Sequence, residues 1–569
     1  MPYRSAVSEF EFIYDKVVPL APVAATERFA EATPDMVSAI LTEGAKLCDT
    51  VMAPLQRAGD LHPAALENGV VRTSPGFAEG LHAIAEGGWV GISAAPEHGG
   101  MGLPLSVATA MNDMMAGANI ALHLCPLLSQ GQIEALEHHA SPELQERYLP
   151  NLISGKWTGT MNLTEPQAGS DIGALTTKAE PNGDGTYAIT GQKIFITWGE
   201  HDATENICHL VLARLPGAVA GPKGISLFMV PKFIPNEDGS LGDRNDLRCV
   251  SLEHKMGIHG SPTAVMEYSG AQGWLVGKEH NGLACMFTMM NNARLGVGMQ
   301  GVGVAEAAYQ HALAYAMDRK QGRTPKPDGT GAIIDHADVR RMLLTMKSDI
   351  FAARSIGAAC AVAIDMSTAT DDAAWSARAA LLTPIAKSFG SDVGCETADT
   401  GIQIHGGMGF IEETAAAQFL RDVRITPIYE GTNAIQAMDL VGRKMMDGGE
   451  AAFALMDELE SDIEAVKAKH PVMANALWNA LATLRETTEW MVKQDMNDRF
   501  AGAVAYQRAF ARILGGAFHL RAALSGDQNR INLARFYMAT LLPDHLGLCV
   551  QAKTGAEALY TLEVEDFAA

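Results

Sequence analysis

One glutamate, Glu430, stands where its carboxylate could act as a general base. It lies in the segment RITPIYEGTNAIQ (424–436), between the apolar pair Ile428-Tyr429 and a Gly-Thr-Asn sequence that is typical of a helix N-cap. A glutamate just before a helix is usually a solvated partner of the helix dipole. The apolar residues before Glu430 favour a second interpretation, in which burial raises the pKa of the carboxyl group and makes it a useful base near neutral pH.

A second polar interruption is MNLTEPQAGSD (161–171), which follows the first expected strand. Pro166 and Gly169 are typical of a turn between strands. Alternatively, a strand end of this kind presents backbone amides, together with the hydroxyls of Thr164 and Ser170, to a planar or phosphorylated ligand. The segment alone does not decide between these interpretations.

A third segment, QIHGGMGF (403–410), contains a Gly-Gly pair that permits very close backbone approach. The pair could serve a pyrophosphate or a tight helix crossing. It is not a Rossmann fingerprint, because the GxGxxG spacing and the preceding strand are both absent.

The elements around these segments change periodicity along the chain. Apolar residues recur at helical spacing in DMVSAILTEGAKLCDTVMAPL, then shorten and alternate in TYAITGQKIFIT and GISLFMVPKF, and later return to four long helical stretches that suit an antiparallel bundle. We therefore expect a mainly α protein with a central β domain. Its expected divisions are a less regular leader (1–33), a helical domain (34–157), a β domain (158–275), a helical bundle (276–446) and a helical C-terminal extension (447–569).

The bulk properties exclude several classes of protein. A length of 569 residues implies roughly three to four packed units. A formal net charge of −23 without a basic patch disfavours binding to nucleic acid or to an anionic membrane surface. The eight cysteines, and the histidines His259 and His405, show no metal-ligand spacing, so we expect no metal site. The 28 methionines could form an adaptable acyl pocket, but core packing is the commoner use.

The first residues, MPYRSAVSEFEF, lack the pattern of a signal peptide, and no apolar run approaches the ~20 residues that cross a bilayer. We therefore expect a cytoplasmic protein.

Taken in order, the polar segments resemble the acyl-CoA dehydrogenase family. The chain shows TEPQAGSD, FIT at 195–197, DRKQGR at 318–323, QIHGGMGF and YEGTNAIQ, and these matches span residues 90–445. The length and the helical C-terminal extension look most like the long subgroup that contains methylthiopropionyl-CoA dehydrogenases and broad-specificity fatty acyl-CoA dehydrogenases. The resemblance implies a helical domain, a β-barrel or sheet domain and a four-helix bundle around FAD.

The resemblance also implies the reaction. Glu430 would remove the α proton of an acyl-CoA thioester while the flavin takes a hydride from the β carbon, which produces a trans-2-enoyl-CoA. The Glu430 backbone amide and a cofactor ribityl hydroxyl would hold the thioester oxygen. The substrate could be 3-methylthiopropionyl-CoA or a short- or medium-chain fatty acyl-CoA.

Further roles follow by matching motifs. The cofactor would contact residues of five segments. Two of these segments, Arg319 and Gln403–Gly407, would reach the FAD of a neighbouring subunit. We therefore expect at least a homodimer, with a tetramer as the alternative. The FAD-binding set is Met161, Asn162, Leu163, Thr164, Gly169, Ser170, Phe195, Ile196, Thr197, Arg319, Gln403, Ile404, Gly406, Gly407 and Thr432. The substrate-binding set is Ser170, Asn291, Arg294, Glu430 and Gly431.

The chain departs from the family pattern at three positions. Phe195 replaces the Trp that many members have beside the flavin, which retains an aromatic face but loses an indole donor. Gln321 stands where most relatives have Phe, which puts the local packing in doubt. Some branches carry the base on the bundle helix, but Ala293 occupies that position here, so Glu430 has no local rival.

Two other functions compete with a dehydrogenase that passes electrons to an electron-transferring flavoprotein. An acyl-CoA oxidase has the same fold and base but reoxidises its flavin with oxygen, and sequence does not exclude it. A non-catalytic FAD-binding scaffold should have lost the base or gained a basic face, whereas this chain keeps Glu430 and is acidic.

Overall fold

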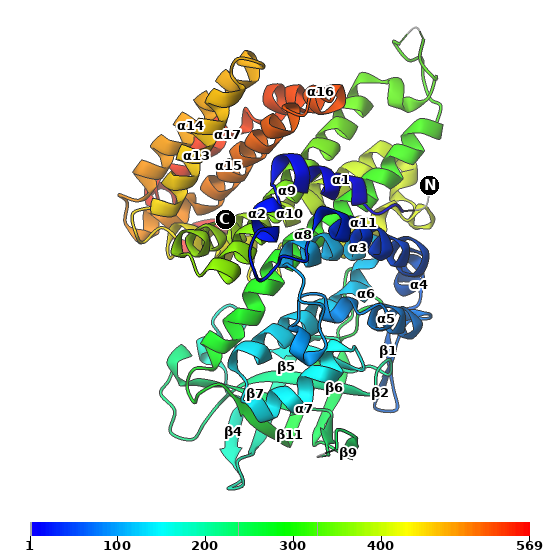
Figure 1. The fold of residues 1–569 in the computed structure, drawn as a ribbon, viewed down its shortest axis with the longest axis vertical. Helices are drawn as coiled ribbons and strands as arrows, with labels where there is room; N and C mark the ends of the chain where they lie inside the picture. Colours follow the sequence, from blue (N-terminus) through cyan, green and yellow to red (C-terminus); the bar gives the residue numbers. More distant parts are fainter. Residues whose placement is uncertain (1–2, 237, 327, 569) are drawn as a thin grey trace.

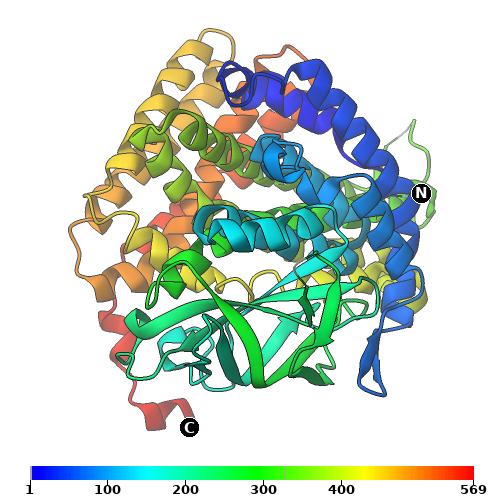
Figure 2. The same cartoon turned by 60° about the horizontal axis from the view of Figure 1, so that its bottom comes forward.

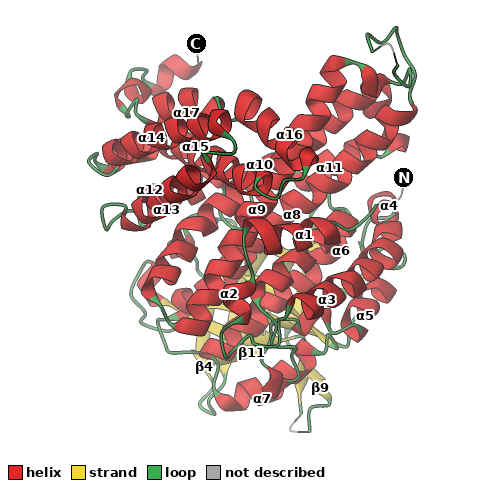
Figure 3. Ribbon diagram, turned by 45° about the horizontal axis from the view of Figure 1, so that its top comes forward, coloured by secondary structure: helices red, strands yellow, loops and turns green. Residues whose placement is uncertain are grey.

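The protein is mainly helical, with one group of strands at one end of the molecule (Figure 1). The computed structural model describes residues 3–236, 238–326 and 328–568. The strands lie beneath a thick layer of helices, and the C-terminal helices form the end opposite to them (Figures 1 and 3). The predicted fold class, mainly α with a central β domain and appended C-terminal helices, is confirmed.

The first helical layer begins with a capped helix. The hydroxyl of Thr33 accepts a hydrogen bond from the backbone N–H of Met36 at 3.3 Å and caps the next helix. The elements are α3 (Pro34–Leu47), α4 (Ala53–Leu61), a hairpin of β1 (Ala65–Glu67) and β2 (Val70–Arg72), α5 (Phe77–Glu86), α6 (Leu105–His139) and α7 (Pro142–Ile153). Helix α6 is buried along most of its length and is kinked at Asn119, whose backbone is non-helical.

The strands form a curled sheet. Its members are β3 (Trp157–Asn162), β4 (Lys178–Pro181), β5 (Tyr187–Thr197), β6 (Asn206–Arg214), β7 (Ile225–Pro231), β10 (Leu247–Leu252) and β11 (Thr263–Val276). Strand β7 pairs with both β11 and β6, so the path β11–β5–β4–β6–β7 closes on itself as a small barrel. A separate two-stranded piece joins β8 (Phe233–Pro235) to β9 (Leu241–Arg244). Figure 2 shows the sheet beneath the helices.

Three long helices form the core of the bundle. They are α8 (Gly282–Asp318), α9 (Ala337–Thr370) and α10 (Ala373–His405), and the shorter α11 (Ala416–Val423) and α12 (Asn433–Val441) follow them. Helices α8 and α10 approach backbone to backbone, because a Cβ at Gly390 would lie 2.3 Å from the carbonyl oxygen of Gly298. Only glycine fits this crossing.

Helix α9 is the one described helix whose length and composition bear on the expectation about membrane-spanning segments. It contains an 18-residue window with a mean hydropathy of 1.4, which by length and composition could cross a bilayer. However, 83% of that window is buried inside the protein. The apolar composition is therefore accounted for by the interior position of α9 in the bundle.

The leader is more regular than expected. It forms α1 (Val7–Phe12) and α2 (Ala21–Ala24), and Phe10, Ile13 and Val17 are fully buried. The Arg530 guanidinium donates two hydrogen bonds of 2.7 Å to the carboxylate of Glu9. The leader thus packs within its own chain.

The C-terminal helices are α13 (Glu450–Val466), α14 (Pro471–Met491), α15 (Met496–Ala523), α16 (Gln528–Phe536) and α17 (Asp544–Ala552). Helix α15 contacts both α9 and α12 of the bundle. Its buried face continues the main hydrophobic core, so these helices pack as part of one body with the bundle.

Candidate active site

A cavity of about 840 Å³ lies where the sheet meets the bundle. Five stretches of chain, distant in sequence, form its wall: the turn after β3, the end of β5, the segment before β11, the first turns of α8 and the loop from α11 to α12. Of the predicted site residues, the cavity brings together Met161, Leu163, Thr164, Gly169, Ser170, Phe195, Ile196, Thr197, Arg294, Glu430, Gly431 and Thr432.

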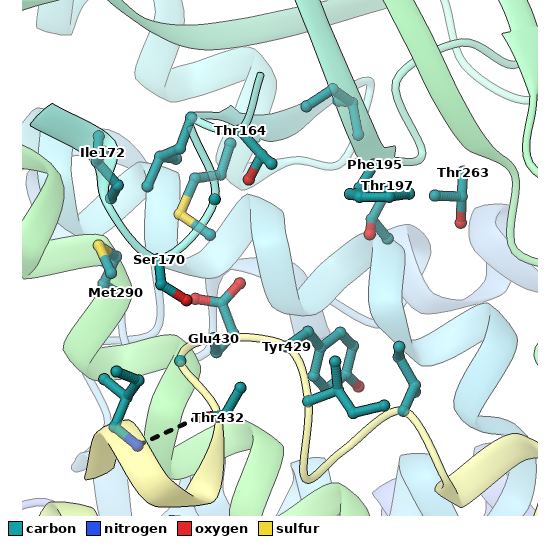
Figure 4. A pocket seen from close by; sticks show the side chains of 18 of the residues that line it. Thr164, Ser170, Ile172, Phe195, Thr197, Thr263, Met290, Tyr429, Glu430 and Thr432 are labelled. Atoms are coloured by element: carbon teal, nitrogen blue, oxygen red, sulfur yellow. Dashed lines mark hydrogen bonds between the residues drawn. The ribbon is translucent and has the colours of Figure 1, made fainter. Parts of the chain in front are cut away.

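Glu430 projects into this cavity from a sharp bend before α12 (Figure 4). Its φ of 56° and the φ of 81° at Gly431 place two successive residues in the left-handed region, which costs free energy for a glutamate. Side chains of Thr432 and Gln436, at the start of the following helix α12, hold this bend in place. The Thr432 hydroxyl caps α12 by accepting from Ile435 N–H at 3.2 Å, and Gln436 Nε2 donates to the Glu430 carbonyl at 3.0 Å.

Burial raises the pKa of Glu430 to about 7, and the nearby positive charges of Arg294 and Lys387 limit the rise. At neutral pH a substantial fraction of this carboxyl group is therefore ionised and able to accept a proton. The cations come from different helices of the bundle. Arg294 Nη1 lies 3.6 Å from Asp439, and Lys387 Nζ donates to Asn433 Oδ1 at 2.9 Å.

The opposite wall carries hydroxyl groups and an aromatic ring. Thr164, Ser170 and Thr197 lie on the sheet side of the cavity, and the Ser170 hydroxyl points into it from the turn after β3 (Figure 4). Phe195 is 58% exposed, which is high for an aromatic residue, and its backbone is in the left-handed region with φ of 60°. This wall therefore offers a planar ligand an aromatic face and several polar partners.

Trp198, just beyond Phe195, faces the interior instead. Its indole N–H donates to the Ala121 carbonyl at 3.2 Å, and its ring stacks on Phe77 with centroids 6.4 Å apart. Of these two aromatic residues, the one at the cavity is thus the phenylalanine that the motif comparison identified.

Other predicted site residues do not line this cavity. The Asn162 side chain is buried in the sheet unit, where it accepts a hydrogen bond from the Tyr268 hydroxyl at 2.9 Å. Asn291 is exposed and accepts from Arg294 at 3.3 Å.

The residues predicted to reach the FAD of a neighbouring subunit also lie elsewhere. Arg319, Gln403, Gly406 and Gly407 are exposed outside the cavity, and Ile404 is buried in a small apolar cluster. Within one chain these residues do not complete the cavity.

The sequence motifs missed one wall of the site. Residues 253–258 line the cavity, together with Arg421, Arg424 and Arg443. Asp422 holds this wall by accepting from the Ile258 N–H at 2.5 Å. Gly257 of KMGIHGSP is the residue that could have indicated this wall from the sequence. The position requires glycine, because a Cβ there would lie 2.2 Å from the Arg421 carbonyl oxygen.

The lining fits a flavin and an acyl thioester better than a metal. The cavity is lined mainly by apolar side chains and has hydroxyl groups at one wall. It also contains the buried Arg294, whose Nε has no hydrogen-bond partner within the described residues. Across residues 3–236, 238–326 and 328–568, no group of three or more His, Cys, Asp or Glu could hold a metal ion.

Comparison with known protein families covers most of the chain. Residues 46–156, 160–271 and 280–446 match the acyl-CoA dehydrogenase N-terminal, middle and C-terminal domains, respectively. Residues 455–563 match the model described as acetyl-CoA dehydrogenase C-terminal like.

Individual proteins show the same similarity. The chain is 45% identical to 3-methylmercaptopropionyl-CoA dehydrogenase of Ruegeria pomeroyi, over 89% of this chain and 88% of that protein. It is 37% identical to a butyryl-CoA dehydrogenase of Syntrophomonas wolfei, over 78% of this chain and 79% of that protein. A structure of an acyl-CoA dehydrogenase from Bacillus anthracis complexed with FAD superposes with a TM-score of 0.76 at 21% identity, covering 97% of this chain and 92% of that chain.

Proposed function

This chain belongs to the acyl-CoA dehydrogenase family, and we propose from that premise that Glu430 is the base that removes the α proton of an acyl-CoA thioester. The family membership identifies the protein as an FAD-dependent oxidoreductase that converts an acyl-CoA to an enoyl-CoA. The observation that carries the proposal is a carboxylate, with its pKa raised by burial to about 7, in the same cavity as the segments expected to bind the flavin.

The residues around Glu430 suggest how the proton is removed. An α proton beside a thioester is too weakly acidic for a glutamate unless the developing enolate oxygen is stabilised. At the left-handed bend of Glu430 and Gly431, successive backbone N–H groups can converge on one ligand atom. This geometry suits donation of the Glu430 N–H to the thioester oxygen. When bound, FAD supplies the hydride acceptor for the β carbon.

The sheet side of the cavity would hold the isoalloxazine ring. The backbone and hydroxyl groups of Leu163, Thr164 and Thr197 would bond its polar edge, while Phe195 packs on it. Ser170 and Arg294 would contact the acyl-CoA, Ser170 from the turn after β3 and Arg294 from α8.

The base is tested by Glu430→Gln, which keeps the size of the side chain but cannot accept the proton. We expect the variant to purify with FAD and to reduce it at least about 10³-fold more slowly with any acyl-CoA. Glu137→Gln, at a half-buried glutamate outside the cavity whose carboxylate accepts from the Ala95 N–H at 2.8 Å, is the matched control and should retain activity. Normal flavin reduction by Glu430→Gln would refute the assignment.

For the acyl group, we propose 3-methylthiopropionyl-CoA or a short fatty acyl-CoA. The relative at 45% identity bears the first name and the relative at 37% identity the name butyryl-CoA dehydrogenase. Met161 and Met290 line the cavity, and thioether side chains adapt to either chain.

Anaerobic bleaching of the flavin with butyryl-, octanoyl- and 3-methylthiopropionyl-CoA tests the acyl preference. We expect the two short thioesters to give higher second-order rate constants of flavin reduction than octanoyl-CoA. An octanoyl preference would favour a medium-chain enzyme.

For the electron acceptor and the assembly, we propose an electron-transferring flavoprotein and a homodimer. The placement of Arg319 and the Gln403–Gly407 loop outside the cavity supports the dimer, since in the proposed assembly the equivalents of these residues reach the cavity from the second chain. Hydrogen peroxide formed in equal amount to enoyl-CoA would instead identify an oxidase, and light scattering that shows a monomer would contradict the shared site.

A further inference from the structure

A buried ion pair lies directly behind the flavin-facing wall of the cavity. Lys193 Nζ is 2.9 Å from Glu165 Oε1, and the two side chains are 0% and 2% exposed. Neither side chain lines the cavity itself. Taking two charges out of water is costly, and a buried ion pair is often no more stabilising than apolar residues of the same volume. Stability alone therefore does not account for this pair.

The carboxylate of Glu165 is surrounded by donors. Thr176 donates from its N–H at 2.7 Å and its hydroxyl at 2.8 Å, while Thr177 donates from its N–H at 3.0 Å and its hydroxyl at 2.5 Å. Burial by itself would raise the pKa of Glu165, but the charge of Lys193 and these hydrogen bonds lower it to about 2. The pair is ionised at neutral pH, and its geometry is fixed from several directions.

Lys193 connects the two segments that face the flavin site. Its Nζ also donates to the Leu163 carbonyl at 3.0 Å, and the N–H of the next residue, Ile194, donates to the Thr164 carbonyl at 2.9 Å. Two residues beyond Lys193 along β5 lies Phe195, whose backbone is in the left-handed region. The ammonium group thereby ties the turn after β3 to the end of β5.

We propose that Lys193 and Glu165 form a positioning pair that holds these two wall segments at the spacing a bound isoalloxazine needs. The inference rests on the proposed placement of FAD in this cavity. Without the Nζ bond to the Leu163 carbonyl, residues 163–164 keep one backbone bond to β5, so the polar groups of Thr164 are held less firmly relative to Thr197. The affinity for FAD then falls, even where the fold survives.

The same sheet unit provides a matched control. Lys232 and Glu200 form a second buried ion pair, with side chains 10% and 1% exposed, and neither residue lines the cavity. Arg244 lies 3.6 Å from Glu200 as a further, weaker partner. Replacing either lysine by methionine leaves a buried carboxylate without its main partner, so both variants should lose stability.

The experiment compares Lys193→Met with Lys232→Met. The dissociation constant of FAD is measured by titrating the flavin-stripped full-length proteins and following flavin fluorescence, and circular dichroism gives the thermal midpoint of each. We expect both midpoints to fall, but the FAD dissociation constant to rise at least about 10-fold in Lys193→Met and less than about 3-fold in Lys232→Met. Equal changes in the two dissociation constants would overturn the proposal.

A milder pair of variants applies if Lys193→Met does not fold. Thr177→Val removes one hydroxyl donor to Glu165, whereas Thr158→Val removes a buried hydroxyl that bonds His201 at 2.9 Å, away from the pair. Thr177→Val should weaken FAD binding about 3-fold relative to Thr158→Val, and no difference between them would reject the positioning role. If the wild-type protein does not bind FAD at all, the placement of the cofactor fails instead, which distinguishes the two failures.

Discussion

The rate of flavin reduction should fall steeply when the pH is lowered from 8 to 5.5. Burial raises the pKa of Glu430 from its ordinary value of 4.5 to about 7. The carboxylate is the form that accepts the α proton, so activity is gained as the pH rises through this pKa. About 90% of such groups are ionised at pH 8 and about 3% at pH 5.5, which predicts a decrease of about 30-fold. A glutamate with the ordinary pKa would lose only about 10% of its rate over the same range.

Stopped-flow measurement of anaerobic flavin bleaching by butyryl-CoA tests this magnitude. The second-order rate constant at low substrate concentration is the relevant quantity, because it reports ionisations of the free enzyme. Bound FAD is followed in parallel by its absorbance, to exclude loss of cofactor at low pH. Lys387→Met provides a check on the cause, since loss of a positive charge near Glu430 should move the midpoint of the profile above pH 7. A rate constant that is flat between pH 5.5 and 8 would show that Glu430 is not the titrating base.

Three further predictions concern residues that support the site. Gln436→Leu removes the hydrogen bond to the Glu430 carbonyl and should lower kcat about 10-fold with little change in KM. The control Gln507→Leu loses a buried 2.9 Å hydrogen bond to the Pro384 carbonyl and should leave kcat unchanged. An equal loss of kcat in both variants would argue against a positioning role for Gln436. Glu9→Gln and Arg530→Met should each lower Tm by a few degrees, because each breaks the same bidentate ion pair. The double variant should lose no more than either single variant, and additive losses of Tm in calorimetry would show that the two residues act independently. Arg319→Met should raise the FAD dissociation constant about 10-fold without shifting the midpoint of the pH profile, and unchanged FAD affinity would remove Arg319 from the cofactor site.

Local sequence was sufficient to predict the fold class and to mark Glu430 as a candidate base, and the resemblance to the acyl-CoA dehydrogenase family then favoured that role over a solvated partner of the helix dipole. The change from helical periodicity to alternation and back predicted a β unit between helical segments of the chain, because each periodicity reflects which faces of an element are buried. Glu430 could be singled out because its bend, its glycine and the Thr432 cap are neighbours along the chain. Similarly, Thr164 and Ser170 lie in one short motif, and the cavity brings that motif near Glu430.

The partners of these residues could not be predicted in the same way. Lys193 is 28 positions from Glu165, and Lys387 and Arg294 approach Glu430 from two other helices, so no local pattern marks them. The leader illustrates the same limit, since the Glu9–Arg530 pair joins residues 521 positions apart.

The amino-acid sequence by itself determined where Glu430, the turns and the caps lie, because conformational preferences and hydrogen bonds to near neighbours act over a few residues. Tertiary packing decided which charges surround the Glu430 carboxyl group and how far water is excluded from it. Those two quantities set the pKa of Glu430, and they depend on the closeness of helices α8 and α10 and of the sheet, which are separate in sequence and meet only in the folded chain.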